Sequence, residues 1–416
     1  MTLHRGTKSK YDNLFEQTWI VDQEGLGNID KDLSTKYCKN LYTRFEVGPE
    51  GQVKMCCGSW LPYSIGNLLE QEVEEIWSGK SAQRLRNQIV TGKWDYCQHK
   101  ICPHIVGDNL PEQSWVTATP VGDPLIDHGV PNRYFKAGQP VFDWEIEALK
   151  NKSLTPYSHP IDILFGTDES CNLYCPSCRA SKIQHSEGPK YERRKYLTEK
   201  LMAAVLRIDP AQFVEVWITG SGDPFGSKIY RELLQTLDGS KHPNLRINLQ
   251  TNGVMLTPKM YDSMHKIHKN LGILVVSLDA GTKDTYENKT RLGGHWDILM
   301  KNCDYLNAKA GAKDNKQTMH PLGLGFSFVV QTDNYKEMPE YVRLIKKRFP
   351  NEEGGITFSL ILDWSVMPPP LYEGKCVWKI THPEHENFLK VLQDPIFLEE
   401  GINLGNMKYL HEKANK

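Results

Sequence analysis

The chain has 416 residues, of which 39% are hydrophobic and 24% charged, so its composition is that of a folded globular protein and excludes a disordered or collagen-like one. Its 50 basic and 51 acidic side chains give a net charge of −1, so no overall field attracts nucleic acid or an anionic membrane. Because domains usually contain about 100–200 residues, this length predicts two or three of them.

Export and membrane signals are not found in the sequence. No apolar run approaches the roughly 20 residues that span a bilayer, and the opening residues MTLHRGTKSKYDNLFEQ lack the apolar stretch of a signal peptide. We therefore predict a cytoplasmic protein without a membrane segment. In that compartment the ten cysteines are expected to stay thiols or thiolates, so the way they cluster is informative.

Residues 1–104 are predicted to form a small metal-dependent domain, because they contain five of the ten cysteines. They also contain one amphipathic helical stretch, GNLLEQEVEEIWSGKSAQRLRNQIV, in which Leu69, Val73, Ile76 and Trp77 have the spacing of a buried helix face. Residues 105–160 include seven prolines and little periodicity, which predicts an irregular connector.

After residue 160, short apolar runs rich in β-branched residues alternate with stretches long enough for helices. The predicted strands are 161–166, 213–218, 246–250, 273–278, 322–330 and 356–362, and the clearest crossover helices are 196–208, 258–268 and 296–310. Continuous apolarity is typical of parallel strands covered on both faces. Six such units fit a partial barrel over 161–365, although an open doubly wound sheet would show the same alternation. Residues 366–416 are expected to cover the barrel mouth.

Three cysteines follow the first predicted strand on one loop, TDESCNLYCPSCR. Cys171, Cys175 and Cys178 have the spacing C-x3-C-x2-C, and three thiolates can bind three irons of a [4Fe–4S] cubane and leave the fourth iron open. A structural zinc site would need a fourth ligand, and His185, the nearest candidate, lies outside the loop. The loop therefore favours an iron–sulfur cluster.

This loop resembles the signature of the radical SAM superfamily, which carries C-x3-C-x2-C after the first strand of a partial (β/α)6 barrel. The resemblance covers about residues 160–365. It implies that S-adenosylmethionine (SAM) chelates the open iron, and that an electron from a carrier such as flavodoxin or ferredoxin cleaves SAM to a 5′-deoxyadenosyl radical. Ser177 stands where the family often has an aromatic residue near the adenine.

The resemblance also predicts cofactor contacts at the carboxyl ends of the later strands, where barrel enzymes bind their ligands. The segment ITGSGDPF resembles the family's Gly-Gly-Glu-Pro turn, which binds the SAM ammonium group. Ser277 matches a ribose-binding hydroxyl and Arg291 an arginine near the methionine carboxylate, while Asp279 is expected to order its loop. Singly, SGDP and TNG are ordinary turn sequences. The predicted contacts are Ser221, Gly222, Asp223, Gln250, Ser277, Arg291 and Gln331.

The amino-terminal cysteines resemble the SPASM/twitch module of radical SAM maturases, which opens with C-x(9–15)-G-x4-C and continues with Gly-Asn-Leu and a helix containing Glu-Ile-Trp. The module usually follows the barrel, whereas here it precedes it. The resemblance implies one auxiliary [4Fe–4S] cluster held by Cys38, Cys56, Cys97 and Cys102. Cys57 could replace Cys56, and a zinc ion held by four thiolates is the alternative.

The two remaining cysteines stand apart from these groups. Cys303 has apolar neighbours at helical spacing, so a packing role is expected. Cys376 follows the last predicted strand, in a segment that could reach the barrel mouth, although it could also simply pack beside Trp378. Radical SAM peptide epimerases are thought to return a hydrogen atom to a Cα radical from a cysteine thiol, and Cys376 is the candidate here.

The resemblance therefore favours a peptide or protein substrate, with epimerisation of L- to D-residues as the leading hypothesis. Oxidation or cross-linking of a peptide, or dehydrogenation of a small molecule such as a sugar, is the alternative among enzymes, with the auxiliary cluster as electron acceptor. An iron–sulfur electron carrier is the alternative without catalysis.

Overall fold

The computed structural model describes residues 31–100, 102–108, 110–118, 143–154, 158–219, 221–312, 322–351 and 354–416. The chain divides into two compact units. The first consists of Met1–Glu46 and Gln52–Pro160, and the second of Val47–Gly51 and Ile161–Lys416. The main division thus falls after Pro160, where the apolar runs of the sequence begin.

The first unit is built from short elements. Its helices are α2 (Asn40–Thr43), α3 (Val73–Trp77), α4 (Lys80–Thr91), α5 (Pro103–Val106), α6 (Gln113–Ala118) and α7 (Asp143–Lys150). Its strands are β1 (Arg44–Val47), whose last residue is counted with the second unit, β2 (Gln52–Lys54) and β3 (Gly66–Asn67). Strands β2 and β3 pair in antiparallel fashion. Buried aromatic side chains such as Phe45 and Trp77, whose ring centroids lie 6.3 Å apart, fill its core.

The single helical stretch predicted for residues 66–90 was wrong in its extent. The Asn67 side chain accepts a hydrogen bond from the backbone N–H of Leu69 and turns the chain, so Leu69 is exposed and the helix starts later. Glu72 and Glu75 form a capping box that begins α3 at Val73. The chain then breaks at Gly79, which is the N-cap of α4.

The second unit contains seven parallel strands, each paired with the next along the chain. They are β4 (Asp162–Phe165), β5 (Val214–Ile218), β6 (Leu245–Thr251), β7 (Leu271–Ser277), β8 (Gly323–Val330), β9 (Ile356–Leu360) and β10 (Ile402–Asn403). A doubly wound sheet reverses its strand order at a switch point, whereas this order runs from β4 to β10 without reversal. The fold is therefore the predicted partial barrel, with the short strand β10 as an addition that the sequence did not indicate.

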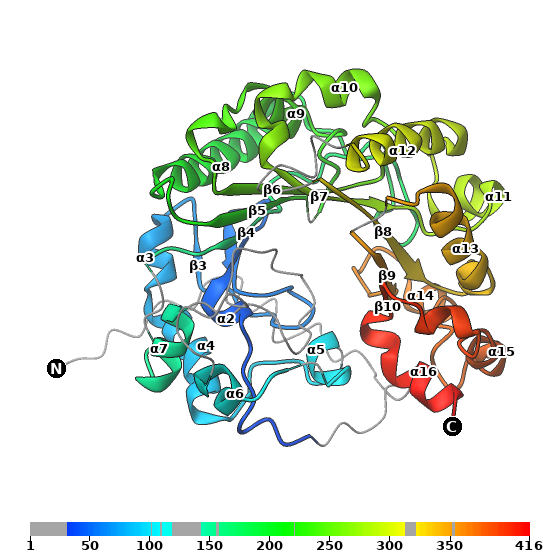
Figure 1. Cartoon of the computed structure of the whole chain (residues 1–416), viewed down its shortest axis with the longest axis horizontal. Helices are drawn as coiled ribbons and strands as arrows, with labels where there is room; N and C mark the ends of the chain where they lie inside the picture. The colour runs from blue at the N-terminus through cyan, green and yellow to red at the C-terminus, as the bar shows by residue number, and fades with distance from the viewer. Residues whose placement is uncertain are drawn as a thin grey trace. The chain divides into compact units, whose positions relative to one another are not determined.

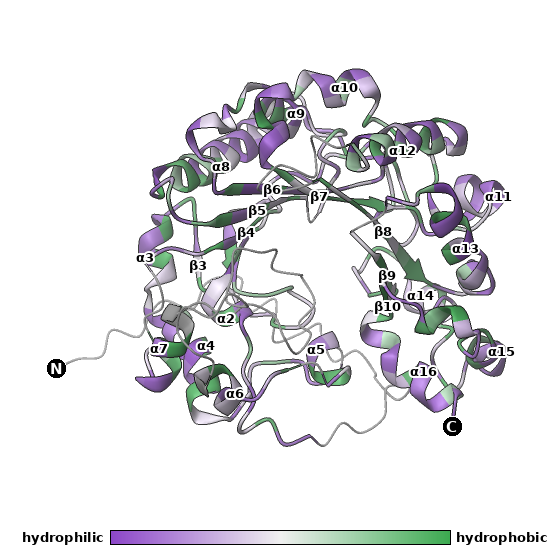
Figure 2. Cartoon of the chain, viewed as in Figure 1, coloured by the Kyte–Doolittle hydropathy of each residue, from purple (hydrophilic) through white to green (hydrophobic). Residues whose placement is uncertain are grey.

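The crossover helices lie on the outer side of this sheet (Figure 1). The helices of the second unit are α8 (Gly188–Arg207), α9 (Lys228–Thr236), α10 (Pro258–Ser263), α11 (Lys283–Thr285), α12 (Trp296–Ala310), α13 (Met338–Arg348), α14 (Pro369–Glu373), α15 (His385–Val391) and α16 (Lys408–Ala414). Figure 2 shows that hydrophilic residues gather on the outer helices, whereas β8 and β9 are largely hydrophobic. Aromatic contacts join α13 to these two strands, because Tyr341 packs against both Phe328 and Phe358.

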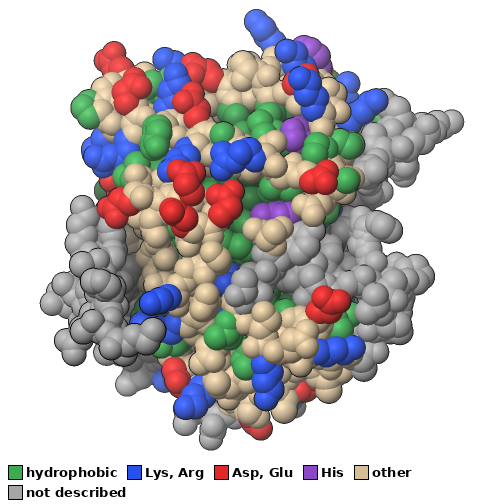
Figure 3. All heavy atoms as spheres, turned by 90° about the vertical axis from the view of Figure 1, so that its left-hand side faces the viewer, with side chains coloured by type: hydrophobic (Ala, Val, Ile, Leu, Met, Phe, Trp, Pro, Cys, Tyr) green, Lys and Arg blue, Asp and Glu red, His purple; other side chains and the backbone are tan. Residues whose placement is uncertain are grey.

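The surface agrees with the balanced charge of the sequence. On the face drawn in Figure 3, acidic and basic side chains are interspersed. Among the helices of the described residues, none has both the length and the apolar character that a bilayer span requires.

Candidate functional site

The three-cysteine loop follows β4, and hydrogen bonds to a buried aspartate, Asp168, hold its first residues in place. Asp168 accepts hydrogen bonds from the backbone N–H and hydroxyl of Ser170, at 3.2 and 2.9 Å, and from the hydroxyl of Ser227 at 2.6 Å. The Tyr230 hydroxyl lies 2.9 Å from the backbone nitrogen of Asp168. Ser227 is the N-cap of α9, so the crossover helix after β5 holds the beginning of the loop.

The turn after β5 packs directly on the backbone of the cysteine loop. A Cβ atom at Gly222 would lie 2.6 Å from the carbonyl oxygen of Asp168 and 2.7 Å from that of Ser170. A Cβ atom at Gly226 would lie 2.8 Å from the backbone nitrogen of Asn172. Only glycine allows the two backbones to come this close at these two positions. The turn that resembles a cofactor-binding motif is therefore also a tight packing contact with the cysteine loop.

The carboxylate of Asp223, at the centre of this turn, accepts four hydrogen bonds from other groups of the protein. Its carboxylate accepts hydrogen bonds from the backbone N–H groups of Phe225 and Gly226, both at 2.9 Å. It also accepts from the Thr251 hydroxyl at 2.8 Å and the Asn252 N–H at 2.7 Å, at the end of β6. A carboxylate has about four acceptor sites, so none is left for the SAM ammonium group that the sequence assigned to this side chain. Asp223 is instead a positioning residue that ties together the ends of two strands.

Each sulfur of the three-cysteine loop faces N–H donors. The contacts are Leu173 N and Asn252 Nδ2 to Cys171 Sγ (3.4 and 3.7 Å), Arg291 Nη1 to Cys175 Sγ (3.7 Å), and Arg179 Nη2 to Cys178 Sγ (3.4 Å). Burial raises the pKa of Cys171 to about 11, so this thiol loses its proton only when a cation compensates the charge. Two guanidinium groups and several N–H donors suit a set of thiolates bound to iron.

Arg179 is a site residue that the sequence reasoning missed. Besides Cys178, its guanidinium donates to the carbonyl oxygens of Glu169 and Ser221, both at 2.8 Å, and so bridges the cysteine loop and the turn after β5. The negative charge of Cys178 raises the pKa of Arg179 against the effect of burial. The sequence did contain a signal for this residue: Arg179 directly follows Cys178, and this position places a guanidinium group next to a predicted cluster ligand.

Arg291, which the resemblance predicts near the methionine carboxylate, lies beside the three-cysteine loop. Its guanidinium forms a 2.7 Å ion pair with Asp279 and reaches Cys175, and its Nε atom is buried without a partner among the described residues. Asp279 also accepts a 2.7 Å hydrogen bond from the backbone N–H of Val329, and it therefore orders its loop as expected. The arrangement leaves one N–H group of Arg291 for a carboxylate.

The other predicted cofactor contacts lie at the predicted strand ends. The hydroxyls of Ser277 and Ser327 are 3.1 Å apart, and Gln250 Nε2 lies 3.4 Å from Ser277 Oγ. These three polar side chains come from β6, β7 and β8. Gln331 is buried after β8, where its backbone N–H donates to Asn334. Ser177 lies half-buried in the turn before the third cysteine.

Cys376 is enclosed. Its side chain is fully buried, and its thiol donates to the carbonyl oxygen of Tyr372 at 3.2 Å. The backbone N–H of Thr332, just after β8, donates to the carbonyl oxygen of Lys375, so the segment lies at the carboxyl end of that strand. Burial raises the pKa of Cys376 to about 12, which keeps it a protonated thiol.

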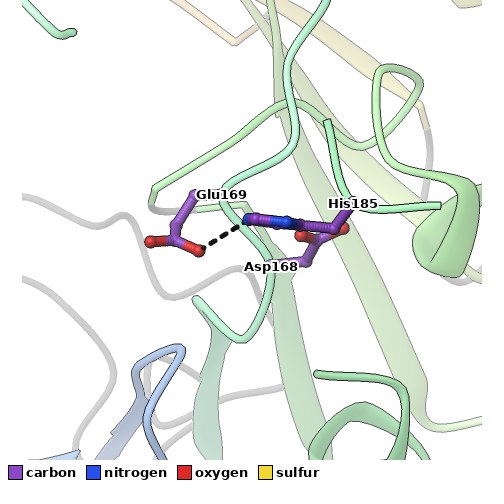
Figure 4. Close-up of side chains that lie close together, drawn as sticks. All are labelled: Asp168, Glu169 and His185. Carbon is purple, nitrogen blue, oxygen red and sulfur yellow. Dashed lines mark ion pairs between the residues drawn. The ribbon is translucent and has the colours of Figure 1, made fainter. Parts of the chain in front are cut away.

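Next to the cysteine loop, Asp168, Glu169 and His185 bring one ligand atom each within 4.8 Å of one another (Figure 4). His185 Nε2 lies 3.4 Å from Glu169 Oε2. The same oxygen of Glu169 is paired with the guanidinium of Arg194, and Asp168 is occupied by serine donors. A second cation is disfavoured beside Arg194, so this network anchors the loop to α8.

The amino-terminal unit holds the second cysteine group. Cys38 precedes α2, Cys56 follows β2, Cys97 follows α4, and Cys102 is the N-cap of α5. All four line one cavity, and Cys57 does not. The other lining residues are Leu41, Trp60, Leu61, Trp94, His104, Ile105 and Leu110. Burial is the main cause of the raised pKa of these four thiols. Charge repulsion between thiols also raises the pKa, and it acts within each of the six pairs, so each thiol lies close to the other three.

The spacing of these thiols can be compared with that of a zinc site. Tetrahedral zinc with bonds of about 2.3 Å brings its sulfur ligands to about 3.8 Å from one another. Among the described residues, three or more metal-binding side chains approach within 4.8 Å of one another only at Asp168, Glu169 and His185. Among the described residues, no three of the four thiols therefore lie within 4.8 Å of one another, and a cubane holds its cysteine ligands further apart than a single zinc ion does.

Hydrogen-bond donors surround the four thiols as well. The side-chain amide of Asn40 lies 3.5 Å from Cys56 Sγ, and that of Gln88 lies 3.6 Å from Cys97 Sγ. Backbone N–H groups of α2 and α5 lower the pKa values of Cys38 and Cys102, although burial dominates and raises both to about 12. This donor set matches a negatively charged iron–sulfur centre.

Comparisons with known families agree with this geometry. The radical SAM superfamily model matches residues 169–349, and the model of the SPASM iron–sulfur cluster-binding domain matches residues 38–103. The first match spans the three-cysteine loop and most of the barrel. The second begins at Cys38 and ends one residue after Cys102.

Two solved structures show similarity to the chain. Streptococcus suis SuiB bound to S-adenosylmethionine has 17% sequence identity and a TM-score of 0.39, over 59% of this chain and 49% of that chain. SuiB bound to the precursor peptide SuiA has 13% identity and a TM-score of 0.42, over 79% of this chain and 64% of that chain. The chain thus spans less than two-thirds of the length of either structure. No curated protein matches it.

Proposed function

Since the chain carries a radical SAM domain preceded by a SPASM domain, with SAM and [4Fe–4S] clusters as their cofactors, we propose that it is an enzyme that modifies a peptide or protein substrate. When bound, these cofactors supply a 5′-deoxyadenosyl radical that abstracts a hydrogen atom from the substrate. The observation that carries the proposal is the loop of three thiols, whose sulfurs face two arginines and which packs on the turn at Gly222. The peptide preference rests on the SPASM domain, because such modules often accompany peptide maturation.

The residues of this chain have distinct tasks in that proposal. Cys171, Cys175 and Cys178 hold the cluster that binds SAM. Arg179 and Arg291 compensate the charge of the thiolates. Apart from Asp223, the cofactor contacts assigned by the resemblance are Ser221 and Gly222 for the ammonium group, Ser277 for the ribose and Arg291 for the carboxylate. Ser177, Gln250 and Gln331 are the further contacts.

For the specific reaction we propose epimerisation at Cα, with Cys376 as hydrogen donor. The S–H bond breaks, a C–H bond forms on the opposite face of the planar radical, and a thiyl radical remains. That radical is then reduced to the thiol by one electron from a carrier such as flavodoxin or ferredoxin and one proton from solvent. The raised pKa keeps the thiol in its hydrogen-donating form. Because Cys376 is fully buried, the segment 369–376 must open for the thiol to meet substrate.

A second candidate reaction is oxidation, by dehydrogenation or cross-linking of a peptide or of a small molecule such as a sugar. The observation that favours it is the group of four thiols around one cavity. A cluster with a full set of protein ligands cannot chelate substrate, but it can accept an electron.

The activity is tested by anaerobic reconstitution and an assay for 5′-deoxyadenosine under reductant. We expect SAM cleavage in the parent chain and none after Cys171→Ala. An electron carrier without catalysis would cleave no SAM in either form, and that result would contradict the proposal.

The reaction type is tested with a short peptide encoded by a neighbouring reading frame, treated in deuterium oxide. Epimerisation through an exchangeable thiol adds one deuterium at each inverted centre, whereas dehydrogenation or cross-linking removes two hydrogens. Cys376→Ala should abolish inversion and leave SAM cleavage intact, and Cys303→Ala, at another fully buried thiol, is the matched control. If Cys376→Ala still inverts the peptide, Cys376 is not the donor.

A further inference from the structure

Two tryptophans, Trp60 and Trp94, line the cavity of the four amino-terminal thiols, and neither indole N–H has a partner among the described residues. Trp94 is 1% exposed, and the Nε1 atom of Trp60 is also buried. Among the described residues neither Nε1 atom finds a hydrogen-bond acceptor. Both side chains border the same cavity, and the Trp60 ring packs edge-on against His104, with centroids 5.8 Å apart.

A buried N–H group without an acceptor is unfavourable, and proteins rarely leave two beside one cavity. The remaining wall of this cavity is formed by the cysteines, His104 and aliphatic side chains. The cysteine sulfurs are already faced by Asn40, Gln88 and backbone N–H groups. Both indole N–H groups therefore remain available as donors on side chains that line the cavity, and the sulfides and thiolates of a cluster are acceptors that suit them.

We propose that the indole N–H groups of Trp60 and Trp94 donate hydrogen bonds to the auxiliary [4Fe–4S] cluster and raise its reduction potential. Reduction adds negative charge to the cluster, and N–H groups aimed at sulfur stabilise that charge. The two tryptophans are thus positioning residues that make the cluster a better electron acceptor. This role does not depend on which substrate the enzyme modifies.

The test isolates the auxiliary cluster in the full-length chain. Cys171→Ala, Cys175→Ala and Cys178→Ala together remove the ligands of the SAM-binding cluster and keep the other four cysteines. In this parent, Trp60→Phe and Trp94→Phe each remove one N–H group. Trp77→Phe, at a buried tryptophan of the same unit whose ring packs on Arg86 and does not line the cavity, is the control. Each protein is reconstituted anaerobically, analysed for iron and sulfide, and titrated electrochemically with EPR detection.

We expect the potential to become more negative in either cavity variant and still more negative in the double variant, with iron content preserved and the control unchanged. An unchanged potential in variants with full iron content would overturn the proposal, as would an equal shift in Trp77→Phe. If phenylalanine prevents cluster assembly, benzothienylalanine, an isostere that lacks only the N–H, replaces each tryptophan, and an unchanged potential then overturns it. A parent that holds zinc in place of iron would overturn the auxiliary cluster itself, separately from SAM cleavage by the unmutated chain.

Discussion

At the scale of single residues, the site depends on groups that hold the cysteine loop as much as on the cysteines. Asp223 is 2% exposed and accepts four hydrogen bonds from β5 and β6 segments. Arg179 joins the loop to the turn after β5 through two carbonyl oxygens. Substitutions at such residues disturb a metal site through its ligands, because the ligands lose their orientation and charge balance.

Arg179→Gln should lower the rate of SAM cleavage by about 10-fold or more, since loss of an outer hydrogen-bond partner typically costs about 10–100-fold in metal affinity or activity. Arg179→Lys should recover part of the rate, because it restores the charge but not the bridging fork. The measurement is 5′-deoxyadenosine formation per iron. Arg348→Gln, at an exposed arginine paired with Asp304, is the control. Equal rates in Arg179→Gln and the parent would refute this role.

At the scale of elements, the turn after β5 and the cysteine loop form one packed layer. Gly222 and Gly226 allow their backbones to touch, and no side chain separates them. The contact explains why a glycine-rich turn follows this strand, because the loop needs a backbone surface against which to close.

Gly222→Ala should displace the loop and reduce the iron bound at the SAM-binding site, since its Cβ would lie 2.6 Å from a backbone oxygen. Iron analysis of the reconstituted protein, together with SAM cleavage, measures the effect. In Gly323→Ala the nearest atom would lie 3.6 Å from the new Cβ, an ordinary contact, so this variant should retain iron. Full iron content in Gly222→Ala would show that the loop does not need the contact.

Strands β5 and β6 bury a charged pair, Glu215 and Arg246. Burial raises the pKa of Glu215 to about 7, against an opposing effect of Arg246. A carboxyl whose folded pKa exceeds its unfolded value of about 4.3 contributes stability that is complete below that value and is lost as the pH rises toward 7.

The free energy of unfolding of the cluster-free chain, relative to that of Glu215→Gln, should therefore fall between pH 5 and pH 8. Chemical denaturation at several pH values measures this difference. Glu340→Gln, at an exposed glutamate of α13, serves as the control and should show no such trend. A difference that is independent of pH would mean that Glu215 has the same charge in the folded and unfolded states over this range.

At the scale of the whole molecule, the chain combines two units, and each contains one cysteine group. Apart from Val47–Gly51, the SPASM match lies in the first unit, and the radical SAM match lies within the second. The ligand sets that we propose for the two clusters therefore do not overlap and can be removed independently.

The reconstituted chain should bind about eight irons, the content of two [4Fe–4S] clusters. Alanine at Cys171, Cys175 and Cys178 should leave about four irons and abolish SAM cleavage. Alanine at Cys38, Cys56, Cys97 and Cys102 should also leave about four irons but retain SAM cleavage. Cys57→Ser should keep the full content, because Cys57 does not line the cavity. Loss of iron in Cys57→Ser would exchange the assignments of Cys56 and Cys57.

The sequence by itself was sufficient where the information is local. The three thiols of C-x3-C-x2-C lie on one loop, so their spacing alone predicts a shared cluster. The alternation of apolar runs and helical stretches predicted the parallel strands of the barrel, because burial on both faces demands continuous apolarity. The prediction of one continuous helix over residues 66–90 failed, because the turn at Asn67 and the N-cap at Glu72 fix the start of the helix more strongly than the spacing of the apolar residues does.

Only the tertiary structure decided which long-range partners complete the site. Asp223 meets Thr251 and Asn252, nearly thirty positions away, and they occupy the acceptor atoms that the motif suggested were free. The structure likewise placed Cys56 rather than Cys57 on the cavity and brought Trp60 and Trp94 to its wall. Spacing along a chain determines which ligands share a loop, whereas the direction of each donor and acceptor is set by packing between distant segments.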